Sequence, residues 1–261
     1  MDNRPIGILD SGLGGITAVN ALKAALPSES FIYVGDTARV PYGEKDVETI
    51  RMYANQLIKF LQDKGVKAVV VACGTIGSNV DIDELPFDLP IIDVVRPGVK
   101  ACLSIPNLRR IGVIATAATI KSEFFPKLLR EKNPDLEVEA CACPMFVPLI
   151  EGGFAERELS YHVAKAYLSE WQKNPVDALI LGCTHYPLLA PVIERILPGT
   201  ILVDIAQAAI EYTREFLMEN NMLSNQSAES EFYASGDIAK FNKMSRMITG
   251  LDIDTKKINW D

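Results

Sequence analysis

Short runs of apolar, mostly β-branched residues alternate with amphipathic segments along most of the chain, and this pattern strongly constrains the fold. The runs predict strands at 5–10, 31–35, 67–72, 90–94, 110–114, 136–141, 177–182, 200–203 and 231–235. The segments between them predict helices at 16–26, 46–64, 97–104, 119–131, 155–172, 187–196, 205–219 and 237–247. Apolar strands alternating with helices are typical of parallel sheets covered on both faces. The sequence therefore predicts an α/β protein, with its clearest loop in the polar stretch 219–231.

Two pairs of similar segments indicate an internal repeat. PIGILDSG and RIGVIATA align at Gly7 and Gly112, which are 105 residues apart, and KAVVVACGT and DALILGCTH align at Cys73 and Cys183, which are 110 apart. The nearly equal offsets predict two similar parallel-sheet α/β domains that face each other across a central active-site cleft. Ligands of open parallel sheets bind beyond the carboxyl ends of the strands, so both cysteines are expected at that cleft.

Charge and hydropathy exclude several classes of partner. The chain has 261 residues, a net charge of −8 and no block of lysine or arginine, so nucleic acid is not expected as a primary partner. No apolar run approaches the ~18 residues that cross a bilayer. The first residues, MDNRPIGILD, enter a strand pattern without a signal segment, which predicts a cytoplasmic protein with no membrane association.

Five cysteines, at positions 73, 102, 141, 143 and 183, predict free thiols because their number is odd and no secretion signal is seen. Cys102 lies on an amphipathic stretch and is expected in the core. Cys141 and Cys143 form a Cys-x-Cys, but alternation places both on one face of a strand and the chain has two histidines. They are predicted to be buried strand residues, and no metal site is expected.

Two thiols opposed across a cleft fit proton transfer at a carbon atom. One thiolate removes a Cα proton while the other thiol delivers a proton to the opposite face, which inverts the stereocentre without a cofactor. A thiol has a pKa of about 8.5 that helix N-termini and nearby bases lower. A threonine and the start of a helical pattern follow both Cys73 and Cys183, which favours this environment. Two buried structural cysteines are the alternative, and the matched placement favours the catalytic pair.

The loops after the other strands supply further candidates. DSGLGG (10–15) lies between a strand and a helix, where its amides can hold an anion. It lacks the Lys-Ser/Thr of a phosphate loop, and Thr17 stands where a dinucleotide fingerprint has its third glycine. Asp10 places a carboxylate at the mouth of the cleft, where it assists a thiol or simply caps a helix. Tyr42 and Gly43 contact a ligand or form a plain turn.

Two later segments carry polar groups with the same ambiguity. Thr116 and Thr119 offer hydroxyls to a carboxylate or mark the start of a helix. Glu151 stands before two glycines in FVPLIEGG, as a hinge acid or a solvated turn residue.

Together these motifs resemble the glutamate racemases of the aspartate/glutamate racemase family. The resemblance runs over nearly the whole chain, from IGILDSGLGG through GDTARVPYGEKD, VVACGT, FVPLIEGG and LILGCTHYPLL to FYASGD. It implies an isomerase without a cofactor that interconverts L- and D-glutamate. It also implies a role in cell wall biogenesis and cell shape, through the supply of D-glutamate for peptidoglycan biosynthesis.

The resemblance assigns roles residue by residue. Cys73 is implied as the base for the D-enantiomer and Cys183 as the base for the L-enantiomer, with Asp10 and His185 as their respective helpers and Glu151 as a further acid. The positions implied to bind substrate are Asp10, Ser11, Tyr42, Gly43, Gly74, Thr75, Thr119, Thr184 and His185.

Gly74 departs from the family pattern, which is Ala-Cys-Asn-Thr where this chain has Ala-Cys-Gly-Thr. Losing one side-chain contact to the substrate removes about 1–3 kcal/mol of binding if nothing replaces it. Two alternatives to a glutamate racemase therefore stay open. One is a racemase of aspartate or another amino acid, and the other is a catalytically silent amino-acid-binding protein. Retention of both cysteines, Asp10, Glu151 and His185 argues against the silent protein.

The family pattern also predicts the domain organisation. Residues 1–97 plus 209–261 are expected to form one α/β domain, completed by the C-terminal segment, and residues 98–208 the second. A homodimer is expected because dimers are common in the family.

Overall fold

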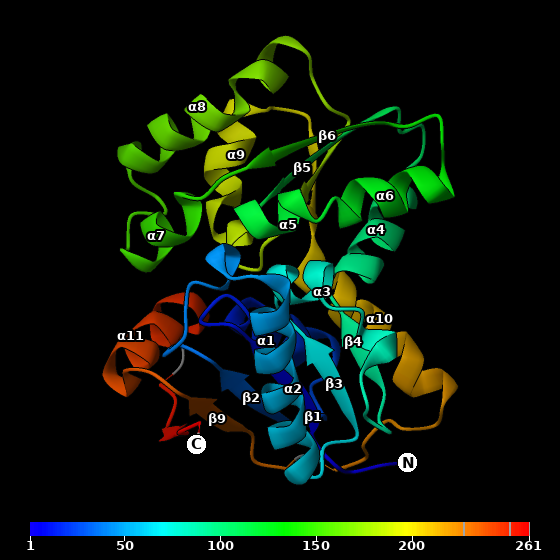
Figure 1. Ribbon diagram of the computed structural model, residues 1–261, viewed down its shortest axis with the longest axis vertical. Coiled ribbons are helices and arrows are strands. Elements are labelled where there is room, and N and C mark those ends of the chain that lie inside the picture. The colour runs from blue at the N-terminus through cyan, green and yellow to red at the C-terminus, as the bar shows by residue number, and fades with distance from the viewer. Residues whose placement is uncertain (227, 251, 261) are drawn as a thin grey trace.

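The chain folds into two parallel β-sheets, one in each half of the molecule (Figure 1). The computed structural model describes residues 1–226, 228–250 and 252–260. The first sheet has the order β10-β9-β2-β1-β3-β4 and the second the order β6-β5-β7-β8, and every strand pair is parallel. The strands of the first sheet are β1 (Ile6–Asp10), β2 (Phe31–Gly35), β3 (Ala68–Val71), β4 (Ile91–Asp93), β9 (Glu231–Ala234) and β10 (Thr255–Lys257). Those of the second are β5 (Arg110–Ala115), β6 (Glu137–Ala142), β7 (Ala178–Leu181) and β8 (Ile201–Asp204).

The predicted internal repeat is visible in the strand order. The run β2-β1-β3-β4 of the first sheet corresponds to β6-β5-β7-β8 of the second. Gly7 and Gly112 occupy the corresponding strands β1 and β5, and Cys73 and Cys183 follow the corresponding strands β3 and β7. The prediction of two similar parallel-sheet α/β units is confirmed, and β9 and β10 extend the first sheet at one edge.

Helices cover the sheets because their apolar residues recur on one face. In α2, Ile50, Ala54, Leu57 and Leu61 are buried at helical spacing, and Asp46 caps the first turn by accepting a hydrogen bond from the Thr49 amide. The α-helices are α1 (Ile16–Ala25), α2 (Val47–Asp63), α3 (Gly74–Asn79), α4 (Val95–Leu103), α5 (Ala117–Lys121), α6 (Phe124–Lys132), α7 (Phe146–Glu151), α8 (Glu158–Lys173), α9 (Ala190–Ile196), α10 (Ile205–Glu219) and α11 (Ile238–Thr249). The 3₁₀-helices are η1 (Tyr42–Glu44), η2 (Ile82–Glu84) and η3 (Tyr186–Leu189).

Several predicted elements differ in detail from the structure. The single helix expected at 119–131 is two helices, α5 and α6, because Glu123 adopts the left-handed conformation with φ 55°. The helix expected at 187–196 begins as the 3₁₀-helix η3 before α9. The short helix α3 begins at Gly74, in agreement with the helical start expected after Cys73, although no helix range was predicted there. The helix α7 and the edge strand β10 were not predicted, because each is six residues or fewer and carries little periodicity.

Two helices connect the halves. α4 and α10 pack against each other, and both contact β8 of the second sheet. One hydrophobic cluster continues from β1 through Cys102 of α4 to β5, which confirms the core position predicted for Cys102. The predicted domain boundaries at 97/98 and 208/209 fall inside α4 and α10, and they stay a prediction.

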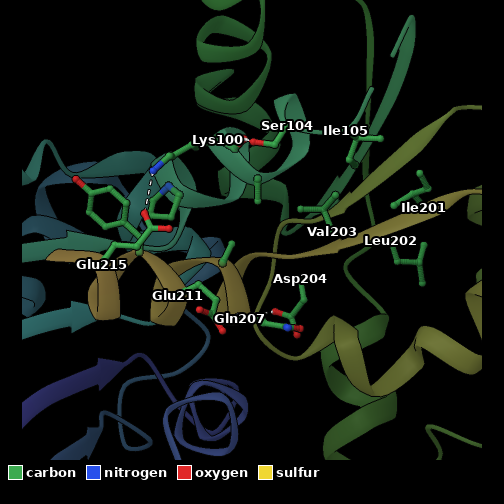
Figure 2. Close-up of a pocket in the computed structure, with 14 residues that line it drawn as sticks. Lys100, Ser104, Ile105, Ile201, Leu202, Val203, Asp204, Gln207, Glu211 and Glu215 are labelled. Carbon is green, nitrogen blue, oxygen red and sulfur yellow. Dashed lines mark hydrogen bonds and ion pairs between the residues drawn. The ribbon is translucent and has the colours of Figure 1, made fainter. Parts of the chain in front are cut away.

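A groove follows the outer side of this helix pair (Figure 2). Lys100 of α4 and Glu215 of α10 form an ion pair of 3.1 Å across it, and Ile201 of β8 borders it. None of the predicted site residues lines this groove. Within the described ranges, no helix combines the length and apolar character needed to span a membrane.

Candidate active site

The loops that follow the strands of both sheets meet at one cleft of about 540 Å³. β1 and β3 are neighbours in the first sheet, as β5 and β7 are in the second. These are the positions where the strand order reverses, and ligands of open parallel sheets bind there. The predicted site residues that line the cleft are Asp10, Ser11, Tyr42, Gly43, Cys73, Gly74, Thr75, Glu151, Cys183, Thr184 and His185.

Cys73 lies on the side of the cleft formed by the first sheet. Its thiol donates to the Ser11 hydroxyl at 3.3 Å, and Asp10 lies beside it, accepting a hydrogen bond from the Gly12 amide at 2.8 Å. Burial, together with the Asp10 charge, raises the pKa of Cys73 to about 12. Burial also raises the pKa of Asp10, although His185 and the backbone amides oppose it. Near neutral pH the Cys73 side chain is therefore a neutral thiol.

Cys183 lies on the opposite side and has a different set of partners. Its Sγ is 3.7 Å from Nδ1 of His185, and Nε2 of His185 is 3.4 Å from Oε1 of Glu151. Oε2 of Glu151 is in turn 3.3 Å from Nζ of Lys240. These contacts link four side chains in a row, which is called the Cys183 row below: Cys183, His185, Glu151 and Lys240.

The charges of the Cys183 row determine the state of His185. Burial by itself lowers the pKa of His185, but hydrogen bonds to Cys183 and Glu151 and the charge of Asp10 outweigh burial and raise it to about 10. The hydrogen bond with His185 lowers the pKa of Glu151, and Lys240 adds to that effect. His185 is consequently an imidazolium near neutral pH, placed against a thiol that it can stabilise as a thiolate.

Two glycines allow the halves to approach closely. A Cβ atom on Gly14 would lie 2.4 Å from both Nδ1 of His185 and Oγ1 of Thr184. A Cβ atom on Gly74 would lie 2.2 Å from the carbonyl oxygen of Gly182. Real Cβ atoms do not approach other atoms so closely, so any side chain at either position requires the loops to move apart.

Hydroxyl groups from both halves of the molecule line the cleft. Thr75 and Thr116 share a hydrogen bond of 3.0 Å between their hydroxyls, across the two halves. Thr119, predicted to bind substrate, is 1% exposed and does not line the cleft. Its hydroxyl accepts hydrogen bonds from Ser78 at 3.2 Å and from Thr116 at 3.0 Å. Tyr42 lines the cleft, and its hydroxyl donates to Asp36.

The structure adds residues that the sequence analysis did not assign to the site. These are Cys143, Val147 and Lys240. Thr116, whose hydroxyl the sequence analysis offers to a carboxylate or to a helix start, lines the cleft as well. Cys141 lies in β6 but is only half-buried, whereas Cys143 is buried but directly follows β6. The expectation of two buried strand residues is therefore wrong in burial for Cys141 and in secondary structure for Cys143. Lys240 carried no signal in the sequence because its partner Glu151 comes from the other half of the molecule.

Comparison with known proteins agrees with this geometry. A profile of the Asp/Glu/hydantoin racemase family matches residues 16–213. The chain belongs to this racemase family. A relative named glutamate racemase 2, from Caldanaerobacter subterraneus, is 41% identical over 256 residues, which cover 97% of this chain and 96% of the relative. A glutamate racemase of Neisseria meningitidis is 39% identical over 251 residues, covering 95% and 93%.

Solved structures of the racemase family share the whole fold. The glutamate racemase of Francisella tularensis, crystallised with D-glutamate, is 40% identical and superposes with a TM-score of 0.92 over 99% of this chain and 98% of that chain. The RacE1 isoform of Bacillus anthracis is 30% identical with a TM-score of 0.95 over the same shares. The resemblance stated from the motifs, the two-sheet fold and membership among the amino-acid racemases, which are isomerases, are confirmed.

Proposed function

We propose that this racemase interconverts L- and D-glutamate by a two-base mechanism with Cys73 and Cys183. The observation that carries the proposal is the pair of thiols on corresponding strand ends of two similar sheets, facing one cleft. The relatives named glutamate racemase, and the D-glutamate in the Francisella tularensis structure, support glutamate as the substrate.

In the proposed reaction a proton leaves Cα on one face and another arrives on the opposite face. With L-glutamate, the Cys183 thiolate takes the Cα proton, so the C–H bond breaks and an S–H bond forms. The Cys73 thiol then gives its proton to the other face of Cα and becomes a thiolate. D-glutamate runs through the same steps in reverse: the Cys73 thiolate takes the Cα proton and the Cys183 thiol delivers one to the other face. Asp10 beside Cys73 and the His185 imidazolium beside Cys183 are the respective helpers.

The charges of the side chains around the cleft suit the first step of the conversion of L-glutamate to D-glutamate. The neutral Cys73 thiol holds the proton to be delivered, and the His185 imidazolium lies with its Nδ1 3.7 Å from the sulfur of Cys183, where it favours a negative charge on that sulfur during the reaction. Among the described residues that line the cleft, Lys240 is the sole lysine or arginine, so basic side chains supply few contacts for the substrate carboxylates. In the proposal these carboxylates are held instead by hydroxyls and backbone amides of Ser11, Thr75 and Thr184.

The first experiment is proton NMR of the protein with each glutamate enantiomer in D₂O, beside circular dichroism of the solution. We expect loss of the Cα proton signal and decay of optical activity from both enantiomers. Replacement of either thiol, Cys73→Ser or Cys183→Ser, is expected to reduce racemisation by at least about 10³-fold, since a hydroxyl is a far weaker base. Racemisation that persists in both variants contradicts the two-base proposal.

A second substrate class is favoured by one observation, the absence of a side chain at Gly74. The backbone of Gly74 lies directly against Gly182, so no side chain from this position reaches the substrate. Aspartate or another amino acid is therefore the alternative substrate. The same deuterium exchange with a panel of amino acids decides between them, because the preferred substrate exchanges its Cα proton fastest.

The biological role follows from the same proposal. The product D-glutamate is proposed to supply peptidoglycan biosynthesis in the cytoplasm, with the protein acting as a homodimer. Depletion of the protein in its host is expected to cause loss of cell shape that added D-glutamate reverses. Analytical ultracentrifugation measures the oligomeric state, and a monomer at micromolar concentration contradicts the homodimer.

A further inference from the structure

Lys240 and Glu151 join the two halves of the molecule at the edge of the cleft. Lys240 belongs to α11, which follows β9 of the first sheet, and Glu151 ends α7, which follows β6 of the second. Figure 1 shows α7 and α11 on the same side of the molecule, one in each half. The Nζ atom of Lys240 is 3.3 Å from Oε2 of Glu151. This ion pair therefore forms only where the halves approach each other.

Glu151 uses its two carboxylate oxygens for different partners. Oε2 contacts Lys240, and Oε1 lies 3.4 Å from Nε2 of His185. That second distance is longer than the 2.7–3.2 Å typical of a good N–H···O bond. Nε2 of His185 is buried and makes no hydrogen bond of standard geometry among the described residues. The position of the Glu151 carboxylate thus determines how well His185 is oriented toward Cys183.

We propose that Lys240 is a positioning residue that holds the Glu151 carboxylate against His185, an inference that rests on the proposed two-base function. When Lys240 pairs with Oε2, Oε1 stays directed at Nε2, and Nδ1 remains toward the sulfur of Cys183. The ion pair between the two halves thereby holds the Cys183 row in this arrangement. Lys240 acts through Glu151 and need not touch the substrate.

Several charged groups besides Lys240 influence the pKa of His185, and a test of Lys240 must separate its effect from theirs. Cys183 and Glu151 contact the imidazole, and Asp10 of β1 faces it from the first sheet. The Lys240 side chain is 58% exposed, so water screens its direct repulsion of the imidazolium. Removing Lys240 is expected to act mainly by releasing Glu151, which lowers the pKa of His185.

The test compares Lys240→Met with a matched control, Lys243→Met, from the same helix. Lys243 is exposed and lies outside the cleft lining. The chain has two histidines, so NMR of histidine-labelled protein resolves His185 with His162, which is 69% exposed, as an internal reference. We expect the titration midpoint of His185 to fall in Lys240→Met, to stay unchanged in Lys243→Met and to be restored in Lys240→Arg.

Kinetics supply a second readout. Lys240→Met is expected to lower kcat from L-glutamate by roughly two- to fivefold, the size of one exposed ion pair. L- and D-glutamate have equal free energies, so any variant must change kcat/KM by the same factor in the L-to-D and D-to-L directions. The ratio kcat/KM therefore cannot distinguish the two sides of the cleft, and kcat and KM are compared separately. Lys243→Met is expected to leave both parameters unchanged.

Three results would overturn the inference or separate it from the proposed function. An unchanged His185 titration in Lys240→Met overturns the positioning role. A raised KM with an unchanged His185 titration also overturns it, because it assigns Lys240 to substrate binding. If no variant, wild type included, turns over glutamate, the proposed function fails, whereas the His185 titration still decides whether Lys240 positions Glu151.

Discussion

The two cysteines of the cleft are both buried but have different charged neighbours. Cys73 has the carboxyl group of Asp10 as its neighbour, which adds to burial in disfavouring the thiolate. Cys183 has His185, whose own partners hold it in the charged form despite burial. One side of the cleft therefore keeps its proton while the other side carries a cation next to its sulfur. The proposed two-base mechanism needs this asymmetry, because in it one sulfur gives a proton when the other takes one.

The raised pKa of His185 predicts a pH-dependent stability. It rises from 6.5 to about 10 on folding, so its contribution is fully present below about pH 6.5 and is lost as pH increases through about 10. We expect the wild-type free energy of unfolding to decline over this window more steeply than that of His185→Asn. Urea unfolding at pH 6, 8 and 10 measures the difference, and parallel pH profiles for the two proteins contradict it.

At the scale of elements, the loop after β2 is held in place by one buried carboxylate. Asp36 accepts hydrogen bonds from Nε of Arg39 at 2.5 Å, Oγ of Ser235 at 2.6 Å and Nε1 of Trp260 at 2.6 Å, and from the Tyr42 hydroxyl. The Arg39 guanidinium lies between aromatic rings, one of them that of Trp260 at 4.8 Å. The segment after β10 thereby supports the loop that carries Tyr42 into the cleft.

Trp260→Phe tests this support because it keeps an aromatic ring and removes the N–H donor. The lost hydrogen bond is worth about 0.5–1.5 kcal/mol, so we expect KM for glutamate to rise roughly two- to tenfold with little change in kcat. Trp171→Phe is the matched control. Trp171 donates to Glu139 at 2.8 Å in the other half and does not line the cleft. Equal changes in KM for both variants would argue against a specific role for Trp260.

At the scale of the whole molecule, the chain leaves the first half through α4 and returns to it through α10, which packs against α1. A buried ion pair secures the return: Nζ of Lys67 is 2.6 Å from Glu29 and donates to the carbonyl groups of Asp2 and Met222 at 2.8 Å each. Glu29 also accepts from the Ser224 amide at 2.7 Å. Lys67 at the start of β3 thus ties the first residues to the segment that follows α10.

Removing one partner of this pair is expected to be costly. Lys67→Met leaves Glu29 buried without its cation, and we expect a loss of about 3–5 kcal/mol in the free energy of unfolding. The double variant Lys67→Met with Glu29→Gln is expected to recover part of the loss, because the glutamine is neutral and still accepts from the Ser224 amide. Urea unfolding measures both. A loss below about 1 kcal/mol in Lys67→Met would show that the pair contributes little.

The predicted and observed elements agree where hydrophobic periodicity is strong. The strands beginning near Ile6, Ala68 and Ala178 are buried along their whole length, so the sequence predicted them within a residue or two. The break at Glu123 and the edge strand β10 were not predicted, because a single left-handed residue and a three-residue strand leave little periodic signal.

The sequence by itself determined the class of fold, the internal repeat, the two thiols at corresponding strand ends and the resemblance to the glutamate racemases. These features can be recognised from residue patterns along the chain, without knowing how the segments pack against each other. Only the tertiary structure decided that Thr119 accepts a hydrogen bond from Ser78, that Gly74 lies against Gly182 and that Lys240 reaches Glu151. Each of these contacts joins segments brought together by the packing of the two halves, and no spacing along the chain encodes the distance between them.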